Sequence, residues 1–166
     1  PGINNAAVDH FRIRVHGKST HVSTPHLGVD ALYIASQIVV AVQGLVTRRT
    51  SPTEPVIIGI GKLNAGTTYN AVAAFAEMEG TTRTISQESR DRVRAQVSET
   101  AQSIAALYGG TAEVEWTDFA AALVNDPQVC EEAARVVDEL LGAGHVVTDR
   151  ELSLSGDNFA EFELYK

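Results

Sequence analysis

The chain has 166 residues, a length that suits one domain or one domain with an appendage. Its net charge of −8 argues against the concentrated basic surface that nucleic-acid binding requires, so we expect no nucleic-acid partner. No apolar run approaches the roughly 20 residues that span a membrane, and we therefore expect no membrane partner.

The first third of the chain predicts a strand, a loop and a long helix. Residues 8–15 alternate apolar and polar side chains, which is typical of a half-exposed strand. A loop rich in His, Ser and Pro follows at 17–29. Asp30 then opens a predicted helix that extends to about Arg49 and ends at the prolines of residues 51–55. The apolar positions expected to face the core are Leu32, Ala35, Val39, Val42 and Val46.

Three further elements follow before residue 120. Residues 56–61 are short, apolar and β-branched and predict a buried strand, and residues 74–84 predict another strand. Ser86 is placed to cap a helix that reaches Tyr108, ahead of two glycines. Residues 111–119 alternate again as a last strand.

The order strand, helix, strand, strand, helix, strand is that of the ferredoxin-like α+β sandwich. This fold class has a four-stranded antiparallel sheet with both helices on one face, and its other face is free to meet a partner. Arg90, Arg92 and Arg94 on the second helix lie among acidic residues, which predicts a solvated helix face.

The tail does not complete this sandwich and adds a C-terminal helical segment. Residues 126–141 begin with Asp-Pro and predict a helix, and residues 145–148 predict a short strand. Cys130, the only cysteine, has apolar neighbours and is expected to be a buried helical thiol; it fits a reducing, cytoplasmic location. The start at Pro1 and the stop at Lys166 within a promising helix start predict a piece of a longer protein.

The His/Ser/Pro loop carries the first candidate for chemistry. His21 and His26 are both potential metal ligands, but no third ligand follows at convincing spacing, so we expect no metal site made by this chain alone. A hydrogen-bonding or proton-transfer role for His21 is better supported, because the surrounding Gly, Ser and Pro residues are consistent with a shaped loop. The alternative is that its ring merely caps neighbouring backbone.

Asn70 and Arg83 flank the predicted strand at 74–84. Arginine is a natural fork for a carboxylate, and the amide of asparagine is a natural dipole for a carbonyl group. The alternative is that Asn70 is a turn residue and Arg83 a surface cation, each without a functional role. A straight strand would hold the two far apart, so a common site requires bending or a second subunit.

The loop motif Gly-Lys-x-x-His-x-Ser-x-Pro-His-x-Gly-Val-Asp-Ala, at residues 17–31, resembles the signature of the metal-dependent aminoacylase/carboxypeptidase enzymes. The branch it resembles is that of the N-acyl-amino-acid amidohydrolases and hippurate hydrolases. Further matches come in the family's order. They are Thr47-Arg48-Arg49, residues 66–72 against Gly-Thr-x-x-Asn-Val-Ile, residues 80–84 against Gly-Thr-x-Arg, and Asn125-Asp126-Pro127.

The resemblance implies that residues 1–118 form a lid and dimerisation domain and that residues 119–166 are a partial segment of the catalytic domain. The full-length protein would be a homodimeric metallopeptidase or amidohydrolase that cleaves the amide bond of N-acyl amino acids or small peptides. Its two divalent metal ions, Zn, Mn or similar, would be held outside this chain, which alone would be inactive. The alternative is a non-catalytic ferredoxin-like module for dimerisation or small-ligand binding.

The resemblance also implies roles for individual residues. His21 would polarise the scissile carbonyl and stabilise the oxyanion, in many members within the neighbouring subunit's site. Asn70 and Arg83 would bind substrate, with Arg83 facing a carboxylate. Residues 154–159 resemble Met-Gly-Ser/Gly-Glu-Asp-Phe, so the backbone amides of Ser155 and Gly156 would help hold that carboxylate. The chain departs from the family pattern at Ala73, Ala74, Asp157 and Asn158.

Overall fold

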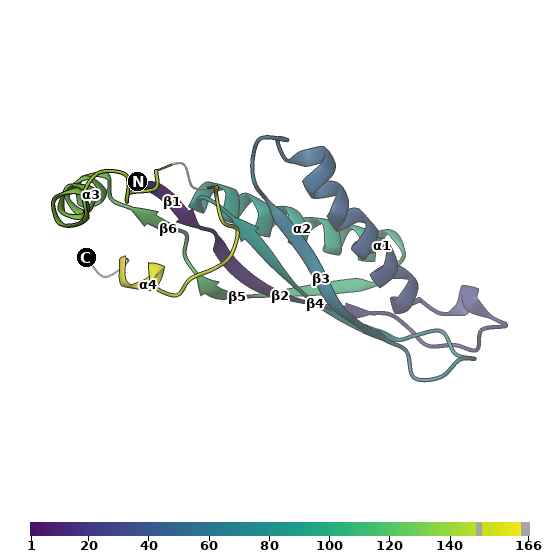
Figure 1. Cartoon of the computed structure of the whole chain (residues 1–166). Coiled ribbons are helices and arrows are strands. Elements are labelled where there is room, and N and C mark those ends of the chain that lie inside the picture. Colours follow the sequence, from purple (N-terminus) through teal and green to yellow (C-terminus); the bar gives the residue numbers. More distant parts are fainter. Residues whose placement is uncertain (149–150, 164–166) are drawn as a thin grey trace.

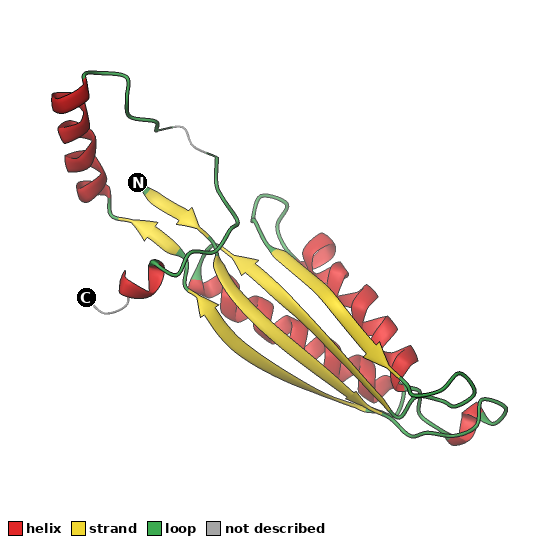
Figure 2. Ribbon diagram, turned by 60° about the horizontal axis from the view of Figure 1, so that its bottom comes forward, coloured by secondary structure: helices red, strands yellow, loops and turns green. Residues whose placement is uncertain are grey.

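A computed structural model describes residues 1–148 and 151–163 of the chain. Its main body is a four-stranded antiparallel sheet in the order β3-β4-β2-β5, with helices α1 and α2 on one face (Figures 1 and 2). This is the predicted ferredoxin-like sandwich, and the fold class is confirmed. The strands are β2 (Ala7–His16), β3 (Ile57–Ala65), β4 (Phe75–Thr84) and β5 (Thr111–Ala120).

The alternation in β2 separates a core face from an open face, as the sequence predicts. Phe11, Ile13 and Val15 are fully buried under the helices, while the residues between them point to the open face. Gly80 lies opposite Phe11 on β4, and a Cβ atom there would come within 2.3 Å of the Phe11 ring. The absence of a side chain at Gly80 therefore makes room for the largest core ring.

Helix α1 (Ala31–Gly44) begins where Asp30 Oδ1 accepts the backbone N–H groups of Leu32 and Tyr33. A π-helical turn, η2 (Leu45–Arg49), extends it to the predicted end. Ala35 and Val42 are buried as predicted, and Val39 and Val46 are partly buried against the core. The prediction is wrong for Leu32, which is exposed. The buried stripe consists of Ala31, Ile34, Ala35, Ile38 and Val42.

The expectation that no apolar run reaches the length of a membrane span is wrong by composition alone, since the helix at residues 31–49 meets that criterion. In this fold, the buried face of α1 packs on the sheet and against α2, as in the core helix of a globular domain. The apolar composition of the helix is thus explained by the core that it helps to build.

Helix α2 (Gln87–Leu107) begins at the predicted cap, since Ser86 Oγ accepts the N–H of Ser89 at 3.1 Å. Its core positions recur at four-residue spacing and include Val93 and Val97. The helix ends at Leu107, and Gly109, two residues later, has a φ of +78°, a conformation that glycine adopts without strain.

Replacing Ser86 with alanine is expected to lower the free energy of unfolding of this chain by about 1 kcal/mol, because an N–H group in the first turn of α2 loses its acceptor. Urea denaturation followed by Trp116 fluorescence measures the change. Ser86→Asp, which keeps an oxygen acceptor, should recover most of it. An alanine variant as stable as the parent would contradict a capping role.

Strand β3 lies at the edge of the sheet and pairs only with β4. The prediction of a buried strand at 56–61 is therefore wrong in this respect: Val56 and Ile58 are buried, but Ile57 is 42% exposed. A short β-branched run looks the same at the centre and at the edge of a sheet, because its own residues do not specify its neighbours.

The tail forms a separate group of elements beside the sandwich (Figure 1). β1 (Gly2–Asn5) and β6 (Leu123–Asn125) pair in an antiparallel ribbon that the sequence did not predict. α3 (Pro127–Leu141) begins at Asp126 as predicted, whereas the predicted strand at 145–148 is wrong because these residues form a loop. α4 (Ala160–Glu163) follows, and residues 164–166, with Lys166, lie outside the described part.

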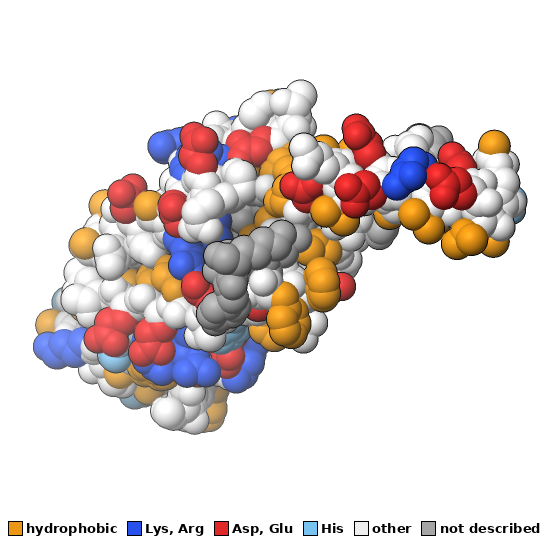
Figure 3. All heavy atoms as spheres, turned by 90° about the vertical axis from the view of Figure 1, so that its left-hand side faces the viewer, with side chains coloured by type: hydrophobic (Ala, Val, Ile, Leu, Met, Phe, Trp, Pro, Cys, Tyr) orange, Lys and Arg blue, Asp and Glu red, His pale blue; other side chains and the backbone are white. Residues whose placement is uncertain are grey.

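Helix α3 buries none of its residues, so the expected burial of Cys130 is wrong and the thiol is only partly covered. Hydrophobic side chains gather along this helix and at its base (Figure 3). Leu140 is 77% exposed and Phe162 on α4 is 72% exposed. An amphipathic helix with an uncovered apolar side is typical of a surface that packs against further protein.

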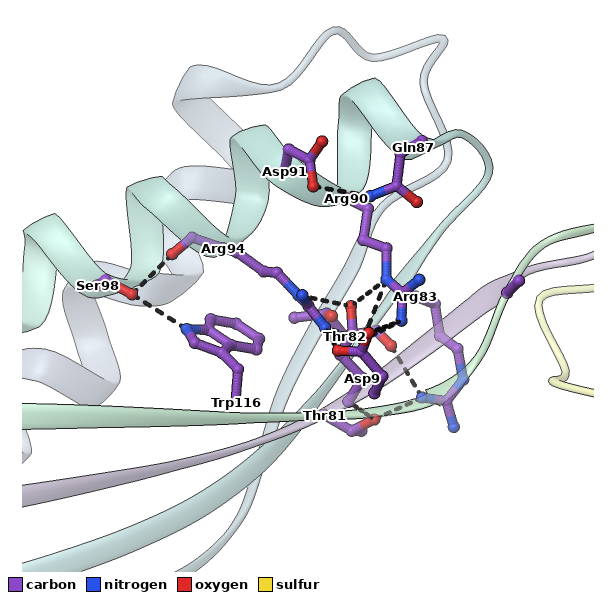
Figure 4. Close-up of polar contacts among 12 residues, drawn as sticks. Asp9, Thr81, Thr82, Arg83, Gln87, Arg90, Asp91, Arg94, Ser98 and Trp116 are labelled. Carbon is purple, nitrogen blue, oxygen red and sulfur yellow. Dashed lines mark hydrogen bonds and ion pairs between the residues drawn. The ribbon is translucent and has the colours of Figure 1, made fainter. Parts of the chain in front are cut away.

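A buried ion cluster joins α2 to the sheet (Figure 4). Asp9 on β2 is 1% exposed and accepts hydrogen bonds from Arg90 Nη2 at 2.6 Å and from Arg94 Nη2 at 2.5 Å. Arg94 also pairs with Asp118 on β5. The prediction of a solvated helix face is therefore wrong for Arg90 and Arg94, because their partner comes from a distant strand.

Candidate functional site

Backbone hydrogen bonds close the predicted His21 loop, and two glycines allow its segments to approach each other closely. Lys18 and Val29 exchange hydrogen bonds of 2.8 and 2.9 Å across its base. A Cβ atom on Gly17 would lie 2.2 Å from the Val29 carbonyl oxygen, and one on Gly28 would lie 2.6 Å from the side chain of Thr20. These close approaches demand glycine. The short 3₁₀ helix η1 (Pro25–Leu27) completes the loop.

The His21 side chain is exposed, and its ring is oriented from within the loop. Its Nδ1 atom accepts a hydrogen bond from the Ser23 backbone N–H at 3.2 Å and lies 2.7 Å from Ser23 Oγ. Nδ1 thus caps neighbouring backbone, which was the alternative to a role in chemistry for the His21 ring. The other ring nitrogen, Nε2, is the atom through which the ring would meet a ligand.

Asn70 lies in the β3–β4 connection, directly against the His21 loop. The Val22 N–H donates to the Asn70 carbonyl at 3.2 Å, and His21 forms a β-bridge with Ala71. The Asn70 side chain accepts a hydrogen bond from the Thr68 hydroxyl at 3.1 Å. Two loops separated by about fifty residues therefore form one tip of the molecule, on the right in Figure 1.

Arg83 lies at the other end of the sheet. It pairs in register with Val8, points to the open face away from α2, and donates to Thr81 Oγ1 and the Thr82 carbonyl (Figure 4). Gly156 packs against Val8, where a Cβ atom would come within 2.3 Å of the valine side chain. Ser155 accepts hydrogen bonds from Asn5 at 3.0 and 3.2 Å.

The predicted site residues therefore form two groups, which we call the tip group (His21 and Asn70) and the base group (Arg83, Ser155 and Gly156). β4 begins beside the tip group and reaches the base group at Arg83, its ninth residue. At about 3.3 Å per residue, this strand spans about 30 Å. A small substrate cannot touch both groups within one copy of the chain.

The open face between the two groups is a ladder of paired charges. Basic residues on β2 lie between acidic residues on β4 and β5, and Arg14 contacts both Glu77 and Glu115. Lys62 and His10 donate to Glu79 and hold the pKa of this carboxyl near 2, against an ordinary value of 4.5. These carboxylates are committed to ion pairs on the sheet.

Within residues 1–148 and 151–163, no three His, Cys, Asp or Glu side chains come together as a metal site would require. His21 and His26 thus do not form part of such a cluster in the described structure.

Comparison with known proteins identifies the fold family. The family profile described as peptidase dimerisation domain matches residues 6–109, which is more than half of the chain. The chain belongs to the M20 peptidase dimerisation-domain family. The matched residues extend from β2 to the end of α2 and include His21, Asn70 and Arg83.

Relatives of this M20 chain are similar over nearly its whole length. It is 34% identical over 157 residues to an N-acetyl-L-cysteine deacetylase of Bacillus subtilis, covering 95% of this chain and 37% of that protein. It is 33% identical to thermostable carboxypeptidase 1 of Saccharolobus solfataricus, covering 95% and 39%. The chain thus spans about two-fifths of the length of these relatives.

Solved structures agree with this assignment. A putative aminohydrolase from methicillin-resistant Staphylococcus aureus superposes with a TM-score of 0.90 at 28% identity, covering all of this M20 chain and 42% of that one. A dinuclear metal-binding peptidase of the M20 family from Bacillus subtilis gives a TM-score of 0.79 at 29% identity, covering 99% and 39%. The β1–β6 ribbon and the helical tail are therefore included in the likeness.

Proposed function

We propose that this chain is the lid and dimerisation part of a metal-dependent hydrolase that cleaves the amide bond of N-acyl amino acids. The observation that carries the proposal is the separation of the tip group from the base group by the length of β4. A two-fold arrangement of two copies brings the tip of one copy towards the base of the other. One substrate then meets His21 and Asn70 of one subunit and Arg83 of its partner.

In this arrangement, His21 and Asn70 donate hydrogen bonds to the scissile carbonyl oxygen as it acquires negative charge. The Arg83 guanidinium binds the substrate carboxylate, and the backbone amides of Ser155 and Gly156 assist it. A pair of metal ions held outside the described residues would supply the activated water that attacks the amide. The lid residues bind and orient the substrate around that attack.

The names of the relatives favour this reaction class. Two are an N-acetyl-L-cysteine deacetylase and an N-acetyldiaminopimelate deacetylase, and others are carboxypeptidases. An N-acetylated amino acid and a peptide share an amide bond next to a carboxylate-bearing residue, which is the pair of features that the tip and base groups are suited to bind. The acyl group itself is not specified by these residues.

The domain boundary and the location of the protein also stay predictions. We place the lid at 1–118 and a segment of the catalytic domain at 119–166, and the exposed apolar side of α3 supports this division because it requires further protein to cover it. A cytoplasmic location is consistent with the single cysteine.

The test is hydrolysis of N-acyl amino acids by the full-length protein and its Arg83→Ala variant. Loss of a charge-assisted hydrogen bond is expected to raise KM about tenfold or more. Arg12→Ala is the matched control, because Arg12 lies on the same face but pairs with Glu77 and Glu79. An unchanged KM in Arg83→Ala would remove the carboxylate role. Absence of hydrolysis in the parent would favour the non-catalytic module instead.

A further inference from the structure

The orientation of the His21 ring determines which of its nitrogens carries a proton. The backbone N–H of Ser23 is directed at Nδ1, with an N–N distance of 3.2 Å. A ring nitrogen that accepts a hydrogen bond from an amide cannot itself hold a proton, so neutral His21 carries its proton on Nε2. The Ser23 hydroxyl, 2.7 Å from the same Nδ1, acts as a second donor to it.

A parallel arrangement orients Asn70 on the adjacent loop. The Thr68 hydroxyl donates to Asn70 Oδ1 at 3.1 Å, which engages the accepting end of the amide. The NH2 end of the side chain is then the end left to meet a ligand. Thr68 lies two residues from Asn70 just as Ser23 lies two residues from His21, so each orienting contact is local.

From these contacts we propose that Ser23 and Thr68 are positioning residues that fix His21 and Asn70 as two hydrogen-bond donors. The catalytic consequence rests on the proposed function, whereas the protonation and orientation of the two side chains do not. An oxyanion requires donors only: a His21 ring protonated on Nδ1, or an Asn70 amide turned over, would present a lone pair to developing negative charge.

The backbone holds the two oriented donors in a fixed relation. Val22 N–H donates to the Asn70 carbonyl at 3.2 Å, and Val72 N–H donates to the Thr20 carbonyl at 2.8 Å. These two bonds flank the His21–Ala71 bridge. Because these backbone bonds do not involve the side chains of Ser23 or Thr68, a loss of orientation at His21 or Asn70 weakens the donor pair without separating the loops.

The protonation of His21 can be measured on this chain without any turnover. In a sample labelled with ¹⁵N at the five histidines, long-range ¹⁵N–¹H spectra distinguish a ring protonated on Nε2 from one protonated on Nδ1. His21→Gln assigns the His21 signals by their loss. We expect neutral His21 to be protonated on Nε2. Ser23→Ala leaves only the longer contact of Nδ1 with the backbone N–H, at 3.2 Å, and should therefore add a minor fraction of the other form. A ring protonated mainly on Nδ1 in the parent would overturn the proposal.

Turnover by the full-length hydrolase tests the consequence. Thr68→Val and Ser23→Ala are each expected to lower kcat about tenfold, as loss of an outer partner of a working side chain does, with KM within about twofold. Thr68→Ser and Ser23→Thr keep the hydroxyl and should restore most of kcat. Ser19→Ala, which removes a hydroxyl from the same loop, is the matched control and should behave as the parent.

The two experiments separate this inference from the proposed function. If His21 is protonated on Nε2 but the full-length protein hydrolyses no N-acyl amino acid, the proposed function is contradicted. The positioning role of Ser23 is then still supported. If kcat is unchanged in both Ser23→Ala and Thr68→Val, the positioning roles are contradicted, whereas the proposed hydrolase activity is not. The same conclusion follows if Ser23→Thr and Thr68→Ser lower kcat as much as the variants without a hydroxyl.

Discussion

Under the proposed function, replacing His21 with alanine in the full-length protein is expected to lower kcat by about 10²-fold or more. A donor aimed at the developing oxyanion acts in the transition state and contributes little to substrate binding, so its loss falls on kcat rather than on KM. Steady-state kinetics with an N-acyl amino acid measures both constants. His26→Ala is the matched control, because His26 lies exposed in the same loop, within η1. Turnover within a fewfold of the parent would defeat the role of His21.

Subunit mixing tests whether His21 acts across the dimer. Homodimers of His21→Ala and of Arg83→Ala should each be nearly inactive at substrate concentrations below KM. In a mixed dimer, one site receives intact His21 from one subunit and intact Arg83 from the other. After random exchange of equal amounts, half of the dimers are mixed, and one of the two sites in each mixed dimer is intact. About a quarter of parental activity should therefore return. No recovery after demonstrated exchange would show that both residues serve one subunit's site.

The second large effect concerns stability. Asp9→Ala is expected to lower the free energy of unfolding by about 3–5 kcal/mol, because it removes the buried carboxylate that accepts the hydrogen bonds of Arg90. The exposed Asp118, 3.7 Å from Arg90, is then its remaining ion-pair partner. The side chain of Arg90 is only 8% exposed. A guanidinium is not deprotonated in proteins, so Arg90 stays charged when its partner is removed. Urea denaturation of this chain, followed by Trp116 fluorescence, measures the loss.

Asp118→Ala is the control for this cluster. Asp118 pairs with Arg94 but its side chain is 69% exposed, so its removal should cost less than about 1 kcal/mol. Equal losses in Asp9→Ala and Asp118→Ala would contradict the view that burial decides the effect. A loss below 1 kcal/mol in Asp9→Ala would show that water reaches Arg90 in the folded protein.

Most of the sandwich was predictable because its signals are local. The two-residue alternation of β2 identifies its core face without knowledge of any neighbour, and Asp30, Ser86 and Asp126 mark helix starts through contacts within three residues. The motif at 17–31 likewise combines residues that meet within one loop. Such features depend on bonds that the chain makes with itself over a few positions.

Several of the predictions that are wrong, or that the sequence did not offer, concern partners distant in sequence. Arg90 looks like a surface cation until β2 places Asp9 beneath it, 81 residues earlier in the chain. The edge position of β3 depends on which strands pair, and the β1–β6 ribbon joins segments more than 115 residues apart. No window of local sequence contains both members of these pairs.

The amino-acid sequence by itself determined the order of the sandwich elements, the caps of the helices and the identity of His21, Asn70, Arg83, Ser155 and Gly156 as candidates. Only the tertiary structure decided that these residues divide into a tip group and a base group. The physical reason is that β4 is a straight, hydrogen-bonded strand that cannot fold back on itself, so its ends are held about 30 Å apart. Of the two ways to a common site that the sequence left open, a bent path and a second subunit, the continuous strand thus removes the first.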